Sequence, residues 1–398
     1  MPDRNALTSA CLAAIAQAKS NRSRATRRNP LWLLPSGSDQ VSERKRPPDS
    51  RARIWRQQPL CASRLMAGNI RSGSVSYRCM HPHDGPVLTH LEPVSGTPLG
   101  NPELRRKKML RTELCYRISR SLIKPPTAQA SDADTYSAWR EEEMCESWER
   151  FSDSDVNGKD VLDFGCGEGP LSLFLARTRK PRSIVGVDID AVAIDRANAA
   201  LDTARGEIST PDVSFVLGGT SGLPVEDGSA DTILAFDCME HVMEPQAILA
   251  DWYRVLRPGG KVLIEWYPFK GPYGPHMSGL VPIPWAHIIF GEKALFQTAA
   301  RLYGDSDYVP GHWDLDEDGK KLPNKWASAS TFSEQGYLNE LDIPTFSRMV
   351  SDEGFRIVRQ DNRGFGQSGA KQAVGKALLK LPVIDEYFIS YTLIELQK

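Results

Sequence analysis

A short glycine-rich segment near the middle of the 398-residue chain holds the residue types with the clearest chemical potential. An apolar stretch at 159–164 precedes three alternating glycines, Gly165, Gly167 and Gly169, and a helix-like stretch begins at Pro170. Glycine lets the backbone adopt positive φ and approach a bound molecule closely. An ordinary strand-to-helix turn rarely needs three alternating glycines behind an aspartate. The pattern therefore predicts a site for a nucleotide-type cofactor.

The neighbouring residues narrow the class of nucleotide. The dinucleotide pattern GxGxxG, started at Gly165, needs glycine or alanine where this chain has Pro170. The GK[ST] sequence of a phosphate-binding loop is absent. A second apolar stretch, 183–189, contains Asp188 near its carboxyl end, where a carboxylate can accept hydrogen bonds from both ribose hydroxyls. Asp188 is therefore the expected ribose ligand.

Alternating strands and helices downstream of residue 129 must position this turn. Strands are predicted at 159–164, 183–189, 213–217, 231–236, 261–266, 355–360 and 387–396, and helices at 170–177, 191–204, 245–256 and 344–353. Aromatic and apolar residues at helical spacing predict one more helix before the first strand. Largely apolar strands that alternate with helices indicate an α/β fold, a doubly wound, Rossmann-like parallel sheet with helices on both faces.

Several motifs, taken in order, carry a resemblance to a known family. They are Asp163-x-Gly165-x-Gly167-x-Gly169, Asp188, Leu223-Pro224, the segment 231–242, and Leu256-Arg257-Pro258-Gly259-Gly260. This set resembles class I S-adenosylmethionine-dependent methyltransferases, in particular the broad small-molecule branch that includes quinone-biosynthesis enzymes. The resemblance covers residues 130–398, and the ordered set is more specific than any single glycine turn.

The resemblance implies S-adenosyl-L-methionine as the cofactor and assigns its ligands by position. The methionine part is expected on Asp163, Gly165, Gly167 and Gly169, the ribose on Asp188, and the methyl group opposite Asp237. The family usually has an aspartate after the third strand that contacts the adenine amine, and Gly219 stands there in this chain. Thr220 is the candidate substitute. Loss of one charge-assisted hydrogen bond costs about 1.5–3 kcal/mol, which binding can survive.

The residues after the fourth predicted strand indicate which kind of acceptor is methylated. Base-amine methyltransferases typically have an Asp/Asn-Pro-Pro-aromatic signature there, whereas this chain reads Asp237-Cys238-Met239-Glu240-His241. A nucleophilic cysteine mechanism would need proline before Cys238, so a small packing role is expected for this residue. Nucleic acid is therefore not the expected acceptor.

Two histidines are candidates for the group that removes the acceptor proton. His276, in a turn-rich segment after the fifth predicted strand, is the first choice, and His241 is the second. A neutral imidazole suits general base catalysis at neutral pH. The alternative for His241 is a hydrogen bond to the start of the next helix. His287 and His312 are assigned to packing or to the surface.

A long insertion, about 267–343, separates the fifth strand from the next predicted helix. Connections in this fold class are usually about 2–6 residues long. Eleven aromatic residues fall within the 61 positions 266–326. An aromatic segment at the carboxyl ends of the strands is expected to act as a substrate lid. The alternative is a second small core, and the two are compatible.

The N-terminal residues differ from the rest of the chain in charge and in apolar patterning. Residues 1–120 carry 22 Lys and Arg against 8 Asp and Glu, whereas the whole chain has a net charge of −1. Residues 1–128 lack sustained apolar periodicity and are predicted to be a basic, mostly disordered extension, followed by a methyltransferase domain at 129–398. The first 38 residues loosely resemble a transit peptide, and a solvated tail or a translation start placed too far upstream are the alternatives.

Composition also excludes several classes of protein. No apolar stretch approaches the roughly 20 residues of a membrane-spanning helix. The seven cysteines are scattered without a CxxC pair, so a disulfide scaffold is not expected and a reducing, cytoplasmic location is predicted. No metal site is expected: Asp314–Gly319 mimics a calcium loop, but its twelfth position is Lys325, and Cys79–His83 has no second ligand pair nearby.

The sequence thus predicts methyl transfer from S-adenosyl-L-methionine to a hydroxyl or activated carbon of a small, fairly apolar molecule. The alternative is a catalytically weak or inactive protein of the same fold with a regulatory or interaction role, which Gly219 favours. A third possibility is RNA methylation guided by the basic front, which predicts RNA affinity that falls steeply with salt. Neither the acceptor nor the oligomeric state follows from the sequence.

Overall fold

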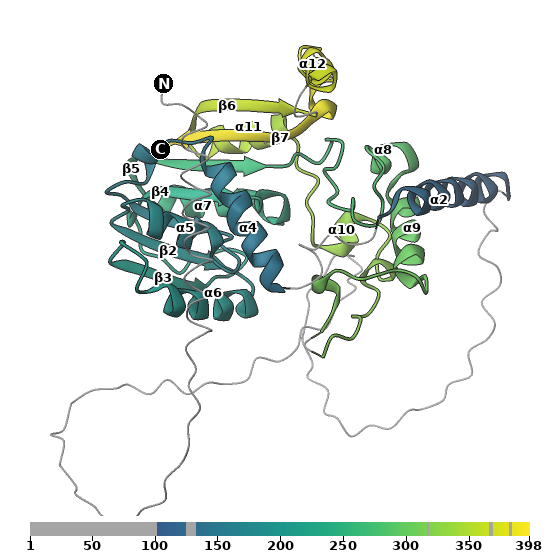
Figure 1. Ribbon diagram of the computed structural model, residues 1–398. Helices are drawn as coiled ribbons and strands as arrows, with labels where there is room; N and C mark the ends of the chain where they lie inside the picture. Colours follow the sequence, from purple (N-terminus) through teal and green to yellow (C-terminus); the bar gives the residue numbers. More distant parts are fainter. Residues whose placement is uncertain (1–101, 125–132, 317, 366–368, 382–383) are drawn as a thin grey trace, which may run out of the picture. The chain divides into compact units, whose positions relative to one another are not determined.

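The computed structural model describes residues 102–124, 133–316, 318–365, 369–381 and 384–398, all of which belong to one compact unit. Within this part of the chain a seven-stranded sheet has the order β3-β2-β1-β4-β5-β7-β6 (Figure 1). The predictions of disorder and of a transit-peptide-like stretch for residues 1–101 lie outside the described residues.

The predicted strands and helices are all present. The strands are β1 (Asp160–Phe164), β2 (Ser183–Asp188), β3 (Asp212–Leu217), β4 (Ala230–Phe236), β5 (Leu256–Trp266), β6 (Arg356–Gly364) and β7 (Ile389–Gln397). The α-helices described are α2 (Pro102–Leu122), α4 (Ala133–Trp148), α5 (Pro170–Thr178), α6 (Ala191–Ala204), α7 (Pro245–Val255), α8 (Ala286–Phe290), α9 (Glu292–Gly304), α10 (Phe332–Gln335), α11 (Ile343–Asp352) and α12 (Gly369–Leu378). Strand β5 starts five residues earlier than predicted because Leu256 already pairs with Ala230 across a bulge.

The direction of the strands places two loops next to each other. Strand β1 pairs in parallel with β2 on one side and with β4 on the other, whereas β7 runs antiparallel between β5 and β6. The chain order therefore reverses between β1 and β4. Ligands of open α/β sheets bind outside the carboxyl ends of the strands at such a point. The glycine turn after β1 and the segment after β4 meet there.

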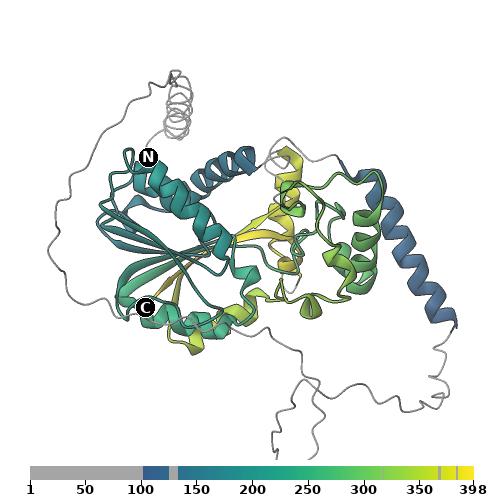
Figure 2. The same ribbon diagram turned by 90° about the horizontal axis from the view of Figure 1, so that it is seen from below.

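Helices cover both faces of the sheet, as predicted (Figure 2). On one face, α4 and α5 bury apolar side chains such as Trp148 and Phe174 against β1 and β4. On the other face, α7 and α11 bury Trp252 and Phe346 against β4 and β5. Among the described residues, no helix is both long enough and apolar enough to cross a membrane.

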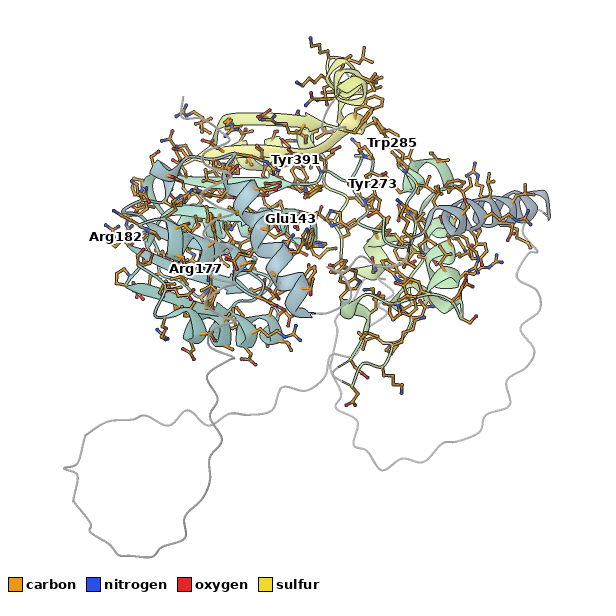
Figure 3. The ribbon with its side chains drawn as sticks, viewed as in Figure 1. Glu143, Arg177, Arg182, Tyr273, Trp285 and Tyr391 are labelled. Atoms are coloured by element: carbon orange, nitrogen blue, oxygen red, sulfur yellow. The ribbon has the colours of Figure 1, made fainter. Side chains whose placement is uncertain are left out.

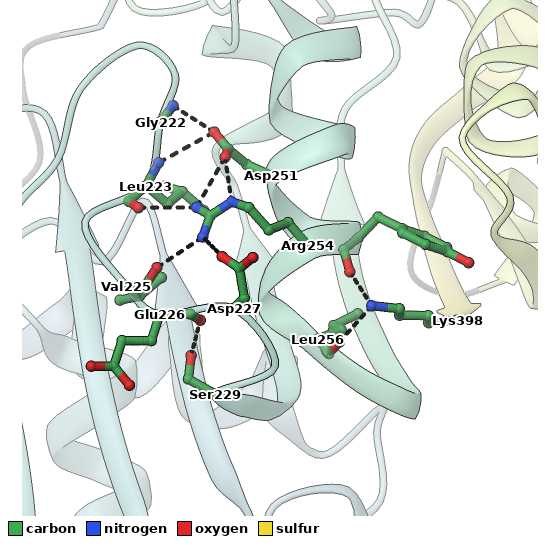
Figure 4. Close-up of polar contacts among 11 residues, drawn as sticks. Gly222, Leu223, Val225, Glu226, Asp227, Ser229, Asp251, Arg254, Leu256 and Lys398 are labelled. Atoms are coloured by element: carbon green, nitrogen blue, oxygen red, sulfur yellow. Dashed lines mark hydrogen bonds and ion pairs between the residues drawn. The ribbon is translucent and has the colours of Figure 1, made fainter.

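Polar contacts of Arg254 fix the loop that precedes β4 (Figure 4). Its guanidinium donates to the carbonyls of Leu223 and Val225 and forms ion pairs with Asp227 and Asp251. Asp251 in turn accepts a hydrogen bond from the backbone N–H of Leu223 at 3.2 Å. Because these groups lie on α7 and on the loop, the helix and the loop are held in one arrangement beside the sheet.

Helix α2 contradicts the prediction of disorder for part of residues 1–128. Its buried face, with Cys115, Tyr116 and Ser119, packs on α9. The Tyr116 hydroxyl donates to Asp305 at 2.9 Å, and Arg301 lies 3.5 Å from the centre of the Tyr116 ring. The sequence did not predict this helix, because its apolar stripe is short and its other faces are strongly basic. Its burial depends on packing against α9.

The insertion after β5 contains α8, α9 and α10 and has a core of its own. Buried aromatic side chains of this core include Phe290, Phe296, Tyr303 and Phe332. The second small core offered as an alternative is therefore present.

Candidate functional site

The glycine turn has the backbone geometry that its sequence predicts. Gly165, Gly167 and Gly169 all have positive φ, at 72°, 52° and 79°. A Cβ atom at Gly165 would lie 2.7 Å from Cβ of Cys238, and one at Gly169 would lie 2.5 Å from the Phe215 ring. A Cβ at Gly167 would meet nothing within 4 Å. Packing thus demands glycine at the two ends of the turn, whereas its centre borders open space.

Asp163 lies beneath the turn. Its carboxylate is buried and accepts a hydrogen bond of 2.6 Å from the hydroxyl of Ser172 in the first turn of α5. Burial raises the pKa of Asp163 to about 6, because the charged form loses its hydration. The geometry makes Asp163 a group that ties the turn to α5.

Asp188 bridges the end of β2 to the glycine turn. One carboxylate oxygen accepts the N–H of Gly167 at 2.8 Å, and the other accepts the N–H of Asp190 at 2.9 Å. Each carboxylate oxygen has a second lone pair for another donor. Thr220, the predicted adenine contact, is exposed in the loop after β3, and the backbone N–H of Gly218 donates to the carbonyl of Asp188.

Asp237, at the end of β4, is held by an arginine that the sequence analysis did not single out. Its backbone has a φ of 54°, unusual for a residue with a side chain, and Arg140 of α4 contacts its carboxylate at 2.9 Å. Arg140 also contacts Glu143 at 2.6 Å (Glu143 is labelled in Figure 3). Although burial works against the charge of Arg140, these carboxylates raise its pKa. Only the position of Arg140 in a predicted helix before β1 hinted at this role.

Glu240 is the most deeply buried ionisable group near the end of β4. Its side chain is 2% exposed, and neither carboxylate oxygen has a hydrogen-bond partner among the described residues. Burial, reinforced by the negative charge of Asp237, raises the pKa of Glu240 well above its ordinary value. The backbone carbonyl of Glu240 accepts the N–H of Asn339, which joins this segment to the end of the insertion.

His276 belongs to the insertion and lies next to the carboxyl group of Glu240. Its Nε2 lies 3.3 Å from Oε1 of Glu240, and its ring contacts those of Tyr267 and His241, each with a centroid distance of 5.4 Å. Burial lowers the pKa of His276 to about 4, so its imidazole is neutral at physiological pH. The positive φ of 52° at His276 shows that the turn aims this side chain by an uncommon backbone conformation.

His241 makes a different contact from the one that the sequence analysis offered as an alternative. Its Nδ1 lies 2.9 Å from the carbonyl oxygen of Tyr337, and its ring packs on the Tyr337 ring at 4.4 Å. It therefore bonds to the insertion rather than to the start of α7. The two histidine candidates, which are 35 positions apart in sequence, lie side by side.

Cys238 and His287 are packed within the fold. Cys238 donates weakly to the Phe164 carbonyl at 3.4 Å, and burial raises the pKa of its thiol, so it is a packing residue rather than a nucleophile. His287 is buried in the insertion and lines a pocket together with Tyr273, Pro275 and Met277. This pocket is small, about 10 Å³, and most of its lining is apolar, including Val281 and Leu295.

The residues of the turn fit the expected nucleotide-type cofactor. The open space at Gly167 admits a ligand where any side chain would intrude, and the Asp188 carboxylate beside it retains capacity for two hydroxyl donors. The family usually has an adenine-binding aspartate after the third strand. The loop 218–222 has Gly219 at that position and contains no carboxylate. The expected ribose ligand Asp188 therefore has free acceptor capacity beside the turn, whereas the expected adenine contact lacks a carboxylate.

Comparisons with known proteins identify a methyltransferase domain in this chain. Residues 162–264 match a family model described as a methyltransferase domain. An uncharacterised methyltransferase from Mycobacterium sp. (strain KMS) is 30% identical over 151 residues, which are 38% of this chain and 54% of that protein. The chain thus spans about half the length of this relative.

Two further similarities concern a second mycobacterial methyltransferase and a solved structure. The phthiotriol/phenolphthiotriol dimycocerosates methyltransferase 1 of Mycobacterium ulcerans is 36% identical over 109 residues, 27% of this chain and 38% of that protein. A crystal structure of a SAM-dependent methyltransferase from Methanosarcina mazei is 19% identical, covers 61% of this chain and 93% of its own, and has a TM-score of 0.37.

Proposed function

Because residues 162–264 form a class I S-adenosylmethionine-dependent methyltransferase domain, we propose that this chain methylates a hydroxyl or activated carbon of a small, fairly apolar molecule. The observation that carries the proposal is the turn at Gly165–Gly169, with its open centre beside Asp188. When bound there, S-adenosyl-L-methionine supplies both the electrophilic methyl group and the leaving group. The protein's own task is to align the acceptor and to take up its proton.

The acceptor side is assigned to the segment after β4 and to the insertion that faces it. His276 is the proposed general base, since its imidazole is neutral; its Nε2 lies 3.3 Å from Oε1 of Glu240, and its other ring nitrogen can accept a proton. His241 is the proposed second contact. Positioning of the acceptor accounts for about 7–11 kcal/mol of barrier reduction in well-oriented reactions, more than a base alone contributes.

The apolar character of the acceptor is supported by the insertion. Tyr267 and Tyr337 pack on the rings of the candidate histidines, and α4 adds Tyr136, whose ring packs on Trp313 at 5.9 Å. The insertion is the proposed substrate lid. The acceptors named for the Mycobacterium ulcerans relative are phthiotriol and phenolphthiotriol dimycocerosates, which are not nucleic acids.

Calorimetric titration with S-adenosylhomocysteine tests the cofactor site. The full chain is compared with Asp188→Ala and with Asp195→Ala, an exposed aspartate on α6, as the matched control. Micromolar binding that is weakened at least about tenfold by Asp188→Ala alone is expected, because a charge-assisted hydrogen bond is lost. Equal affinity in both variants would contradict the ribose assignment.

The base is tested separately. With an acceptor identified by screening, His276→Ala should lower kcat at least about a hundredfold and leave S-adenosylhomocysteine affinity unchanged. An unchanged kcat would remove His276 from the mechanism. If the folded wild-type chain gives no binding heat at all, the non-catalytic alternative favoured by Gly219 replaces the proposed activity.

A further inference from the structure

The cluster of Glu240, His241 and His276 has a second possible use. We infer that these three side chains form a binding site for one divalent transition-metal ion, such as Zn²⁺, with an open position for the oxygen of the acceptor. The inference rests on the proposed function, since it concerns the same acceptor side. No metal site is expected from the sequence, because His276 lies 35 positions from the adjacent pair Glu240 and His241, and only the fold brings it to them.

The geometry of the cluster meets the first requirement of a metal site. One ligand atom from each residue lies within 4.8 Å of the others. Ligands at the ~2.1 Å bond length of zinc lie roughly 3.4 Å apart in a tetrahedron, so the cluster must close by about 1.4 Å at most. His276 is carried by a turn in the insertion, and a small shift of that turn closes the site.

Glu240 provides the second, independent observation. A carboxylate this deeply buried is normally hydrogen-bonded or paired. Neither oxygen of Glu240 has a well-aligned hydrogen-bond partner among the described residues, and its polar neighbours are Nε2 of His276, 3.3 Å from one oxygen, and the side chain of Asp237. A bound cation would satisfy both oxygens. Asp237 adds negative charge to the surroundings, and Arg140 partly offsets it.

His241 is oriented as a metal ligand would be. The carbonyl oxygen of Tyr337 can only accept a hydrogen bond, so Nδ1 of His241 carries the proton at their 2.9 Å contact. Nε2 then presents a free lone pair. Metal-bound histidines typically donate their other ring N–H to a carboxylate or backbone carbonyl in this manner.

The three ligand side chains determine which metal ions fit the site and which reaction such an ion supports. Two imidazoles and one carboxylate suit zinc and the divalent first-row transition metals, and a set of three leaves a position open. An acceptor hydroxyl bound there loses its proton to water more readily because the cation stabilises the alkoxide. The new O–CH₃ bond forms as the C–S bond of the sulfonium breaks, its electron pair stays on sulfur, and one proton is released. In this state His276 is a ligand and not the base.

The test is metal binding by the full chain after removal of metals with a chelator. Co²⁺ is titrated and followed by its visible absorption, with Zn²⁺ competition, in the wild type, Glu240→Gln and Glu244→Gln. Glu244 is exposed four positions away and is the matched control. Because residues 79–83 contain other possible ligands, the readout is the difference between variants. We expect Glu240→Gln to bind one equivalent less than the other two proteins.

Equal stoichiometry in all three proteins would overturn the inference. His241→Asn serves as a second variant, and circular dichroism shows whether each variant is folded. S-adenosylhomocysteine titration of the metal-free protein separates the two proposals. If that titration succeeds while the Co²⁺ difference is absent, only the metal site is wrong, and if it fails, the proposed methyl transfer is wrong.

Discussion

Asp163 and Glu240 are buried carboxyl groups near the ends of two neighbouring strands, and burial raises the pKa of both. Their surroundings differ. Asp163 is bonded to Ser172 beneath the glycine turn, whereas Glu240 has no hydrogen-bond partner among the described residues and faces His276. At the level of single residues, the first carboxyl therefore supports the turn, and the second is available to bind or to position another group.

Replacement of Asp163 by asparagine should stabilise the protein at neutral pH. The unfolded chain releases the Asp163 proton near the ordinary value of 3.8, whereas the folded protein holds it up to about pH 6. Stability therefore falls as the pH rises between these values, by about 3 kcal/mol in all. Asp163→Asn keeps an acceptor for Ser172 and avoids this loss. Urea unfolding at pH 7.5 should show a gain of roughly 2–3 kcal/mol.

The pH dependence is the control for this prediction. Near pH 4 the carboxyl is mostly protonated in the folded protein and half-protonated in the unfolded chain, so the two proteins should be nearly equally stable. A gain that is the same at pH 4 and pH 7.5 would show that another effect of the substitution, and not the buried charge, is responsible.

At the level of elements, the glycine turn joins β1 to α5, and its three glycines have distinct tasks. Gly169 precedes α5, adopts φ 79° and leaves no room for a Cβ against Phe215. Gly167 has a similar backbone conformation and faces open space. The sequence pattern alone treats the glycines as equivalent, whereas packing separates Gly169, which supports the fold, from Gly167, which borders open space.

Two alanine substitutions test this division. Gly169→Ala should cost about 2–4 kcal/mol in free energy of unfolding, because left-handed strain adds to overpacking against Phe215. Gly167→Ala should cost only the strain, about 1–2 kcal/mol, yet weaken S-adenosylhomocysteine binding at least about tenfold. Urea unfolding and calorimetry measure the two effects. Equal destabilisation, with equal loss of binding, would refute separate tasks.

At the level of the whole molecule, β7 holds the sheet together at one side. It pairs with β5 along Lys261–Trp266 and with β6 along the other edge, and Leu393, Ile394 and Leu396 are fully buried. The last strand in sequence is thus an inner strand. All described residues, from 102 onward, belong to one compact unit with it.

Two truncations follow from this arrangement. A chain of residues 100–398 should unfold in urea with the same midpoint as the full chain, because the described core lies entirely within it. A chain that ends at 388 should fail to fold and should aggregate, because β5 and β6 then expose unpaired edges and the apolar side chains that β7 covers. A cooperative transition in the shorter chain would contradict the central role of β7.

The sequence by itself determined the features that depend on local forces. Apolar periodicity defined the strands of the sheet and the helices α5, α6, α7 and α11, but not α8, α9, α10 or α12, and the alternating glycines located the turn, because period and φ are properties of neighbouring residues. The motif order pointed to the methyltransferase fold and its cofactor, which the family match at 162–264 supports. The individual site residues remain proposals.

The tertiary structure alone decided which side chains meet. Arg140 and Asp237 are 97 positions apart, and Glu240 and His276 are 36 apart, so their contacts depend on how α4 and the insertion dock against the ends of the strands. Helix α2 was missed for the same reason, because its buried stripe makes sense only beside α9. Such contacts depend on burial against distant segments, which a local pattern does not encode.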